Sequence, residues 1–347
     1  MMIKSSIRPR QIIKWSLLLL TTICLTYWTI NKDRNRHQIY SDNPSCGEFY
    51  QKFADNLAVL DNYTFNVSKS YMKILSLDNE GIGLLSAQKE SNSHPQVVVT
   101  AVSANHYGES QGLIKDIHQK LLYLYPEIKL IVYDLGLTKP QLLAMHTYCK
   151  CEVRTFEFDQ YPDHVNYLKG YTWKPIIIQL MLREYSFIIW NDASVRYNGK
   201  QYGLEKVFKN TRKHGLQIMG GGMSSITSRT SENTFKVLKE DPCIFSNYVE
   251  VQATWMFFQR NALILNAVMR PWVACALHYG CMDFQNSSSL LNCTNESIVP
   301  HSCHRFDQST IGIILTRLFN KERKYFIFKE NDIGIIKRDL PVNYFHN

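Results

Sequence analysis

The sequence predicts an α/β fold in which helices cover both faces of a mixed, mostly parallel central sheet, preceded by one transmembrane helix. Two observations predict the sheet. Apolar runs alternate with segments of helical periodicity from Pro95 onward, and the first run, residues 97–102, is continuously apolar as in a buried parallel strand. Such alternation is typical of strands joined by right-handed helical crossovers. The transmembrane helix is predicted by an apolar stretch at residues 12–30.

Residues 12–30 are interpreted as a signal-anchor. At a rise of about 1.5 Å per residue, the stretch is just long enough for the hydrocarbon layer. Four basic residues and no acidic residue lie toward its N-terminal side, counting Lys14 within the stretch. This bias predicts a cytosolic tail, residues 1–11, and a type II membrane protein. The alternative is a cleaved signal peptide, but the residues after Leu25 are bulky where a cleavage site needs small ones.

Beyond the anchor we expect a stem and N-terminal lumenal segment, residues 31–94, and a folded lumenal domain, residues 95–347. The formal charge of +9 is concentrated near the membrane: residues 1–40 hold seven basic residues and one acidic residue, which leaves +3 for residues 41–347. The basicity therefore indicates a membrane flank, and nucleic acid is not an expected partner.

Glycosylation signals and cysteines both favour a lumenal or extracellular location. Five N-x-S/T sequons lie beyond the anchor, at Asn62, Asn66, Asn286, Asn292 and Asn295. Eight of the nine cysteines also lie there, an even number that suggests disulfides in an oxidising compartment. Their pairing is left open. The alternative, a closed zinc site, lacks a C-x-x-C pair.

Each element of the α/β core is predicted from its own pattern. Strands are apolar runs, and helices show apolar residues at helical spacing, with Pro140 and Pro175 in first turns. Strands are expected at residues 97–102, 129–133, 153–158, 186–190, 216–219, 254–259 and 325–328. Helices are expected at residues 112–125, 139–148, 173–183, 205–214, 232–238, 262–277 and 307–319. A helix is also expected around residues 46–60, and a loop rich in cysteines and sequons at 278–303.

The strongest candidate for chemistry is Asp192, which follows an apolar strand. Ligands of α/β sheets bind beyond the carboxyl ends of the strands, so this carboxylate is expected at the mouth of the sheet. A divalent ion bound there could bridge the phosphates of a nucleotide-sugar, and Mn²⁺ and Mg²⁺ prefer such oxygen ligands. Lys174, at the start of the preceding helix, could contact the same phosphates. The alternative is that Asp192 only closes a turn.

Six segments carry a resemblance to a known fold family: VVVTAVSANHYGES, LIVYDLGL, YTWKPIIIQ, FIIWNDASVRY, RPWVACALHYGCM and CHRFDQSTIGIIL. Through them, residues 95–320 resemble the Rossmann-like GT-A fold of nucleotide-diphospho-sugar glycosyltransferases. They are most similar to an uncharacterised group of single-pass ectodomains, frequent in nematodes, that is assigned to that fold.

The resemblance implies a role for several residues. Thr100 and Asp134 would lie near the nucleotide, and Asp192 would be the first carboxylate of the D-x-D metal motif. Ser194 stands where the second Asp would be, and its neutral hydroxyl is a weaker metal ligand, which puts a bound Mn²⁺ or Mg²⁺ in doubt. Asp307 resembles a C-terminal acidic motif that could supply a metal ligand or position substrate. Its alternative role is that of a first-turn acid on a helix.

Four further features are weighed in the same way. His304 and Arg305 are candidate contacts of the diphosphate, or else solvated or paired side chains. Glu250 could act as a general base on an acceptor hydroxyl. The run Gly220–Gly222 lacks phosphate-loop spacing and is expected to be a flexible or close-packed turn; the alternative is a backbone that an acceptor sugar can approach. Trp255 and Trp272 could stack on sugars, although such aromatics are more often buried.

Two functions remain open at this point. The first is a glycosyltransferase of the Golgi membrane that moves a hexosyl or related group from a nucleotide-sugar to a glycan or glycoprotein acceptor. The second is a non-catalytic ectodomain on the same fold that binds a glycan or another partner. Cell-surface location is the alternative to the Golgi. No G-x-S-x-G or H-E-x-x-H motif supports a serine hydrolase or a zincin protease.

Overall fold

A computed structural model describes residues 46–88, 94–293 and 299–345, and the described residues from Glu48 onward form one compact unit. Its centre is a seven-stranded sheet of order β3-β2-β1-β4-β7-β6-β8. β7 pairs antiparallel with both of its neighbours, and every other pair in the sheet is parallel. The predicted mixed, mostly parallel sheet is therefore confirmed. Its strands are β1 (Val97–Val102), β2 (Lys129–Asp134), β3 (Glu152–Thr155), β4 (Phe187–Asn191), β6 (Leu216–Ser225), β7 (Val249–Gln259) and β8 (Ile327–Phe328).

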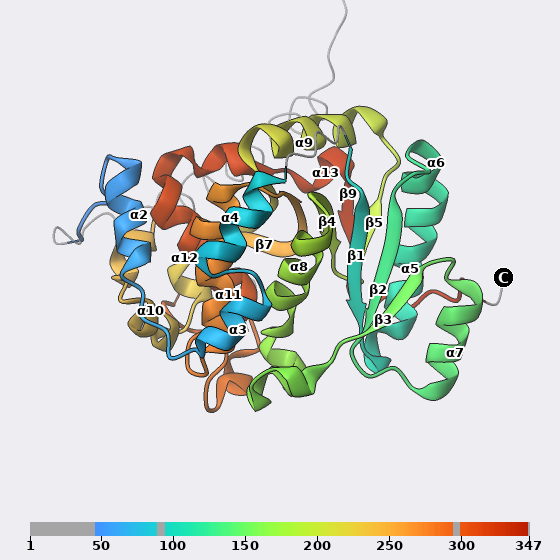
Figure 1. Ribbon diagram of the computed structural model, residues 1–347, viewed down its shortest axis with the longest axis horizontal. Helices are drawn as coiled ribbons and strands as arrows, with labels where there is room; N and C mark the ends of the chain where they lie inside the picture. Colours follow the sequence, from blue (N-terminus) through green and yellow to red (C-terminus); the bar gives the residue numbers. More distant parts are fainter. Residues whose placement is uncertain (1–45, 89–93, 294–298, 346–347) are drawn as a thin grey trace, which may run out of the picture. The chain divides into compact units, whose positions relative to one another are not determined.

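Helices cover both faces of this sheet (Figure 1), because strand side chains alternate between two separate apolar clusters. In β1, Val97 and Val99 face one cluster, and Val98 and Val102 face the other. The first cluster is completed by α2 (Phe53–Asp61), α4 (Asn79–Ala87), α8 (Trp173–Glu184), α10 (Glu232–Leu238), α11 (Arg270–Leu277) and α12 (Phe306–Phe319), with α3 (Lys69–Ile74) alongside. The second is completed by α5 (Tyr107–Asp116), α6 (Leu122–Leu124), α7 (Lys139–Tyr148), α9 (Gln201–His214) and α13 (Glu330–Ile333).

Local chemistry explains where several helices begin and end. α7 begins at a capping box, in which the Thr138 backbone N–H donates to Gln141 Oε1 at 3.0 Å, with Pro140 in the first turn. Gly215 follows the last residue of α9 and caps the helix with a φ of 86°, a left-handed conformation that glycine adopts without strain. A short antiparallel pair, β5 (Val195–Tyr197) with β9 (Gly334–Ile336), brings the C-terminal segment beside the residues that follow β4.

Some predicted boundaries were wrong. The strand expected at 153–158 ends at Thr155, because Phe158 opens a 3-10 turn. The helix expected at 112–125 begins at Tyr107 and contains a π-helical turn, Ile117–Leu121. Gly220–Gly222 lie within β6 rather than in a turn. The expected close packing does hold at Gly221, where an added Cβ would lie 2.3 Å from the Glu250 carbonyl oxygen.

The packed core begins earlier than the sequence analysis expected. Phe49, Leu60, Leu75 and Ile82 are buried in the same apolar cluster as the sheet and α8. The segment before Pro95 therefore contributes to the core of the folded domain. Figure 1 shows α3 and α4 lying beside α8 and α11.

Disulfides are present, as the cysteine count predicted. Among them are bonds that join Cys149 to Cys151, Cys275 to Cys281, and Cys293 to Cys303. The first pair closes a C-x-C segment just after α7. Of the sequon asparagines, Asn62, Asn66, Asn286 and Asn292 are exposed, and Asn295 lies outside the described residues.

The predicted anchor, residues 12–30, also lies outside the described residues. Within residues 46–88, 94–293 and 299–345, no helix has both the length and the apolar character needed to span a membrane.

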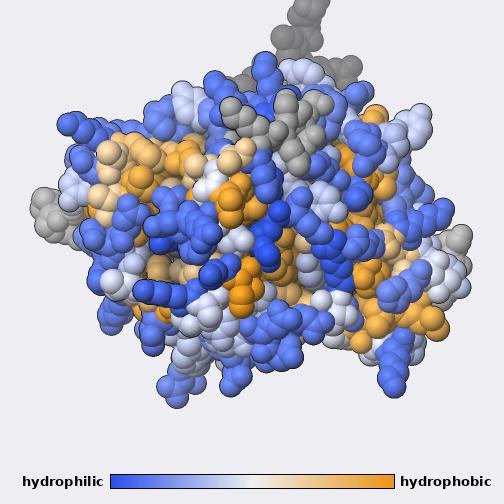
Figure 2. All heavy atoms as spheres, in the orientation of Figure 1, coloured by the Kyte–Doolittle hydropathy of each residue, from blue (hydrophilic) through white to orange (hydrophobic). Residues whose placement is uncertain are grey.

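Hydrophilic side chains cover much of the face drawn in Figure 2, and apolar side chains gather in patches between them.

Candidate active site

The candidate site lies at the carboxyl ends of β1 and β4. The chain places β2 and then β3 on one side of β1, and it returns to place β4 on the other side. The order in which strands are added to the sheet therefore reverses between β1 and β4, although these two strands are parallel. Such a switch point is where open α/β sheets bind ligands. β6 and β7 continue past the end of β4, because Asn191 is opposite Trp255 while β7 begins at Val249. Residues 249–254 of β7 therefore lie beyond the carboxyl end of β4.

Three charged residues from different elements meet at this edge. Lys174 Nζ, from the first turn of α8, lies 3.0 Å from Asp192 Oδ1, just after β4. The same nitrogen lies 2.6 Å from Asp307 Oδ2, in the first turn of α12. It also donates to the Ala253 carbonyl of β7 at 3.3 Å. The side chain of Lys174 is 3% exposed, that of Asp307 is 7% exposed and that of Asp192 is 24% exposed, so Asp192 is the member that solvent reaches.

The ionisation of this triad follows from its burial and its pairing. Burial alone would lower the pKa of Lys174, but the charges of Asp192 and Asp307 outweigh it and hold that pKa above its ordinary value. Lys174 therefore stays an ammonium at neutral pH. Burial raises the pKa of Asp307 despite the opposing effect of Lys174.

The turn after β4 fixes the position of Asp192. The Asp192 backbone N–H donates to the Thr254 carbonyl at 2.8 Å, and Trp190 Nε1 donates to Asp192 Oδ1 at 2.8 Å. The buried Arg196 guanidinium donates to the Ala193 carbonyl at 2.6 Å and to the Glu109 carbonyl at 2.9 Å. The carboxylate thus does close a turn, as its alternative interpretation proposed, while remaining part of the charged cluster.

Strained backbone adjoins two members of the triad. Tyr171, three residues before Lys174, has φ of 53°, and Phe306, directly before Asp307, has φ of 46°. Their rings lie 5.8 Å apart. Non-glycine residues in this region cost about 1–3 kcal/mol each and cluster at functional sites. The fold therefore accepts unfavourable backbone conformations at Tyr171 and Phe306 next to Lys174 and Asp307, as is common at functional sites.

A second charged group surrounds Glu250 on the extended part of β7. Gln308 Nε2 donates to Glu250 Oε2 at 2.6 Å, and Arg229 Nε lies 3.9 Å from Glu250 Oε1. Burial raises the pKa of Glu250, and the positive charges of Arg305, Arg229 and Arg338 oppose that rise. Because Gln308 follows Asp307 directly, the two charged groups are neighbours at the start of α12.

Two residues that the sequence analysis did not select belong to this edge. His106 follows β1 and pairs with Glu109 at 2.9 Å; this hydrogen bond raises the pKa of His106, and the charge of Asp192 adds to the rise. Arg338 follows β9, and its Nη2 donates to Thr254 Oγ1 at 3.4 Å, on the residue whose carbonyl accepts from the Asp192 backbone N–H. His106 could have been found by the rule that selected Asp134, since both follow strand ends. Arg338 had no such signal, because the pairing of β9 with β5 brings it there.

Three predicted site residues are buried or hold local structure. Thr100 is fully buried inside β1, which continues to Val102. Asp134 Oδ1 accepts from the backbone N–H groups of Gly136 and Leu137, at 2.8 and 2.6 Å, and so forms the turn after β2. His304 is 1% exposed, and its two ring nitrogens contact Ser231 N and Met282 O. This geometry leaves His304 no nitrogen for a diphosphate and corrects its candidate role.

The tryptophans have structural positions. Trp255 and Trp272 are both fully buried, so neither offers a face to a sugar. Trp272 Nε1 donates to the Asp307 carbonyl at 3.1 Å and thereby helps to fix the start of α12. Burial, the commoner position of such aromatics, is the one observed.

A divalent ion does not fit between the two aspartates as they stand. The position between Asp192 and Asp307 is filled by the Lys174 ammonium, at 3.0 and 2.6 Å. Ser194 is 3% exposed and supplies no charge. Among the residues that the structure describes, no three His, Cys, Asp or Glu side chains are grouped as metal ligands. The residues present thus match a monovalent ammonium and not a Mn²⁺ or Mg²⁺ ion.

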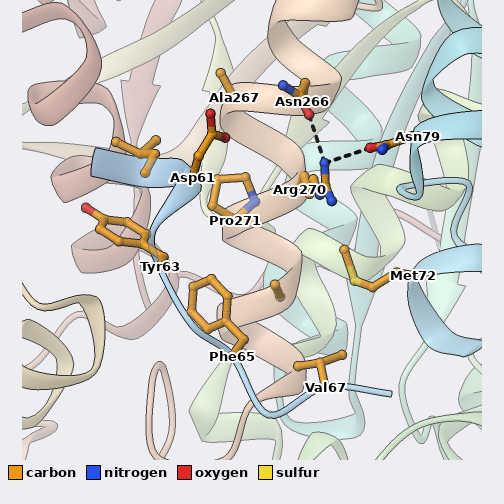
Figure 3. A pocket seen from close by; sticks show the side chains of 12 residues that line it. Asp61, Tyr63, Phe65, Val67, Met72, Asn79, Asn266, Ala267, Arg270 and Pro271 are labelled. Atoms are coloured by element: carbon orange, nitrogen blue, oxygen red, sulfur yellow. Dashed lines mark hydrogen bonds between the residues drawn. The ribbon is translucent and has the colours of Figure 1, made fainter. Parts of the chain in front are cut away.

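A separate pocket of about 550 Å³ lies between residues 60–67 and α11 (Figure 3). Tyr63, Phe65 and Met72 contribute its apolar lining. Arg270 Nη1 donates to Asn79 Oδ1 of α4 at 3.1 Å and to Asn266 Oδ1, one helical turn earlier in the chain, at 3.2 Å (Figure 3). None of the lining residues belongs to the charged groups at the sheet edge.

Comparisons with known proteins give little about function. A family model described as "Protein of unknown function (DUF1647)" matches residues 48–179, which is under half of the chain. No curated protein matches the sequence.

Among solved structures, the chain is similar to core-mannan synthase A from Aspergillus fumigatus in its Mn/GDP form, with 9% identity and a TM-score of 0.42 over 72% of this chain and 76% of that one. It is similar to the mannosyltransferase Ktr4p from S. cerevisiae, with 10% identity and a TM-score of 0.39 over 83% and 88%. It is also similar to mouse xyloside xylosyltransferase 1, with 12% identity and a TM-score of 0.36 over 68% and 84%. TM-scores of this size carry no weight for the function of this chain.

Proposed function

We propose that this protein is a glycosyltransferase that moves a sugar from a nucleotide-sugar donor to a hydroxyl group of a glycan or glycoprotein acceptor. The observation that carries the proposal is the meeting of Lys174, Asp192 and Asp307 at the switch point of the sheet. A site of this kind, with one partly exposed carboxylate above a buried ion pair, suits a ligand that is both polar and charged.

The proposed chemistry uses groups at both ends of the site. The acceptor oxygen forms a bond to the anomeric carbon, while the bond from that carbon to the diphosphate oxygen breaks. The nucleoside diphosphate leaves with the electron pair, and Arg305 and Arg338 stabilise its charge. The acceptor proton passes to Glu250, since burial raises the pKa of its carboxyl toward the range in which a general base works.

The proposal is tested by donor turnover. The full chain, purified in detergent, is incubated with a panel of nucleotide-sugars and candidate acceptors, and release of nucleoside diphosphate is measured. In this proposal the partly exposed Asp192 carboxylate positions the donor beside the buried ion pair. We therefore expect release from at least one donor, reduced about a hundredfold or more in Asp192→Asn, a loss of the size seen when a preorganised electrostatic group is removed. Glu232→Gln, at an exposed carboxylate of α10, is the matched control and should keep full activity. Absence of release from every donor, or full activity in Asp192→Asn, would contradict the proposal.

We also propose a type II topology in the Golgi membrane, with the catalytic domain in the lumen, in preference to the cell surface. The predicted anchor at residues 12–30, the exposed sequons and the disulfides support a lumenal domain. A short anchor suits thinner membranes. Protease protection of tagged chains in sealed Golgi vesicles tests this: a tag at the C-terminus should be protected and one at the N-terminus cleaved.

The pocket of Figure 3 favours a second candidate function, a non-catalytic module that binds a glycan or another partner. Its aromatic and amide groups are of the kind that contact sugars. Glycan-array binding that is lost in Phe65→Ala and kept in Asp192→Asn, together with no donor turnover, would favour this second function over the first.

A further inference from the structure

Lys174 differs from an ordinary surface lysine in that each N–H donor of its ammonium has a partner within the protein. An ammonium has three N–H donors, and Lys174 Nζ has three partners: Asp192, Asp307 and the Ala253 carbonyl. The aromatic rings of Tyr171 and Trp190 also face it, with centroids 5.5 and 5.7 Å from Nζ. The charge is therefore held in one place by two carboxylates, a carbonyl and two rings.

We propose that the Lys174 ammonium is a built-in cation that holds the place of a divalent metal ion between Asp192 and Asp307. The site would then bind the donor diphosphate without a metal, through the guanidinium groups of Arg305 and Arg338. This second part rests on the function proposed above, whereas the first part does not.

Competition for the same oxygen atoms is the first argument. A Mn²⁺ or Mg²⁺ ion would need the Asp192 and Asp307 oxygens at about 2.0–2.2 Å, and these are the atoms that Lys174 contacts. Entry of the ion would place two cations against each other, or else expel the ammonium from its partners. Because Lys174 is 2% exposed and lies in the first turn of α8, an expelled ammonium would have to remain buried.

Ser194, two residues after Asp192, also disfavours a divalent ion. Ser194 is buried, and its backbone carbonyl accepts from Lys337 N at 2.8 Å, which ties this position to the C-terminal segment. A second carboxylate on this turn would give a divalent ion the extra charge it needs. Among the described residues, the carboxylates that pair with Lys174 are those of Asp192 and Asp307, and the single ammonium leaves the three groups with a net charge of −1.

Arginines supply the remaining positive charge near the site. Arg305 is half-buried at the residue before α12, two positions from Asp307, and the exposed Arg338 donates to Thr254 Oγ1 at 3.4 Å, beside the backbone contact of Asp192. Guanidinium groups bind phosphate oxygens in pairs and need no metal to do so. In this arrangement the buried Lys174 ammonium holds the two aspartates in place. Arg305 and Arg338 bind the donor diphosphate.

Binding of Mn²⁺ tests the first part directly, without any donor. Electron paramagnetic resonance on the full chain in detergent counts bound Mn²⁺. We expect no ion that depends on Asp192, so that wild type and Asp192→Asn give the same count. Lys174→Met frees both carboxylates and should gain one bound Mn²⁺, which the double variant Lys174→Met with Asp307→Asn should lose. One Mn²⁺ in wild type that disappears in Asp192→Asn would overturn the proposal.

Nucleoside diphosphate binding tests the second part and does not depend on the folding of Lys174→Met. Affinity is measured for the wild-type chain with EDTA and with Mn²⁺ present. We expect the two values to agree within about twofold, and Arg338→Gln to weaken binding about tenfold or more. A tenfold loss in EDTA would overturn the metal-free site. If no nucleotide binds under either condition, the proposed function fails, while the Mn²⁺ count still decides the role of Lys174.

Discussion

Replacement of Lys174 by methionine tests how tightly the charged triad is integrated into the fold. The variant keeps most of the side-chain volume and removes the charge, leaving Asp307, 7% exposed, without its partner at 2.6 Å. Breaking a buried ion pair in this way destabilises a protein by about 3–5 kcal/mol. For a chain of this size, each kcal/mol lowers the Tm by roughly 2 °C, so a loss of about 6–10 °C is expected.

The assay is thermal and urea unfolding, followed by circular dichroism at pH 7 with a fixed scan rate. Lys209→Met, at an exposed lysine of α9, is the matched control and should change stability by less than about 0.5 kcal/mol. The double variant Lys174→Met with Asp307→Asn should recover about 2 kcal/mol or more, because it no longer buries an unpaired carboxylate. A loss below about 1 kcal/mol in the single variant, or strict additivity in the double variant, would refute the reasoning.

Three other expectations follow from particular contacts. Burial lowers the pKa of His304 to about 4, so the folded protein favours the neutral imidazole. Below about pH 6.5 the unfolded chain binds a proton at His304 that the folded protein does not bind. The free energy of unfolding should therefore fall by roughly 2 kcal/mol between pH 7 and pH 5. Urea unfolding at the two pH values should show this loss, and His304→Gln should reduce it. Gly221→Ala should destabilise the protein by about 1–3 kcal/mol, because its Cβ would lie 2.3 Å from the Glu250 carbonyl oxygen, whereas Gly222→Ala, with open space around it, should change stability far less. Equal effects of the two alanines in the same assay would contradict this packing. Peptide mapping of the chain from a eukaryotic host should find glycans on the exposed Asn62 and Asn66, and their absence would count against a lumenal domain.

Much of the fold could be predicted because its strands are short apolar runs with clear ends. β1, α7 and α10 begin and end at the predicted residues. The approach of Lys174 to Asp192 could also be predicted, since a crossover helix begins near the edge at which the next strand ends. The prediction that β6 would be short was wrong because Gly220–Gly222 resembles a turn, although glycine here permits close contact with β7.

Other parts of the site depend on contacts that no local pattern records. His304 and Asp307 are three residues apart, yet the backbone turn at Phe306 directs Asp307 to Lys174, while His304 lies among residues 231, 234 and 282. Arg338 reaches the site only because β9 pairs with β5. The helices before Pro95 joined the core for a similar reason: their apolar side chains pack against a surface that the later helices create.

The most direct test of the account is a crystal structure of the protein with a nucleoside diphosphate, grown in the presence of Mn²⁺. The account predicts phosphate oxygens in contact with Arg305 and Arg338, beside Asp192, with the Lys174 ammonium still between the two aspartates. A Mn²⁺ ion bound by Asp192 and Asp307 would contradict the role given to Lys174. A nucleotide bound away from the ends of β1 and β4 would contradict the site itself.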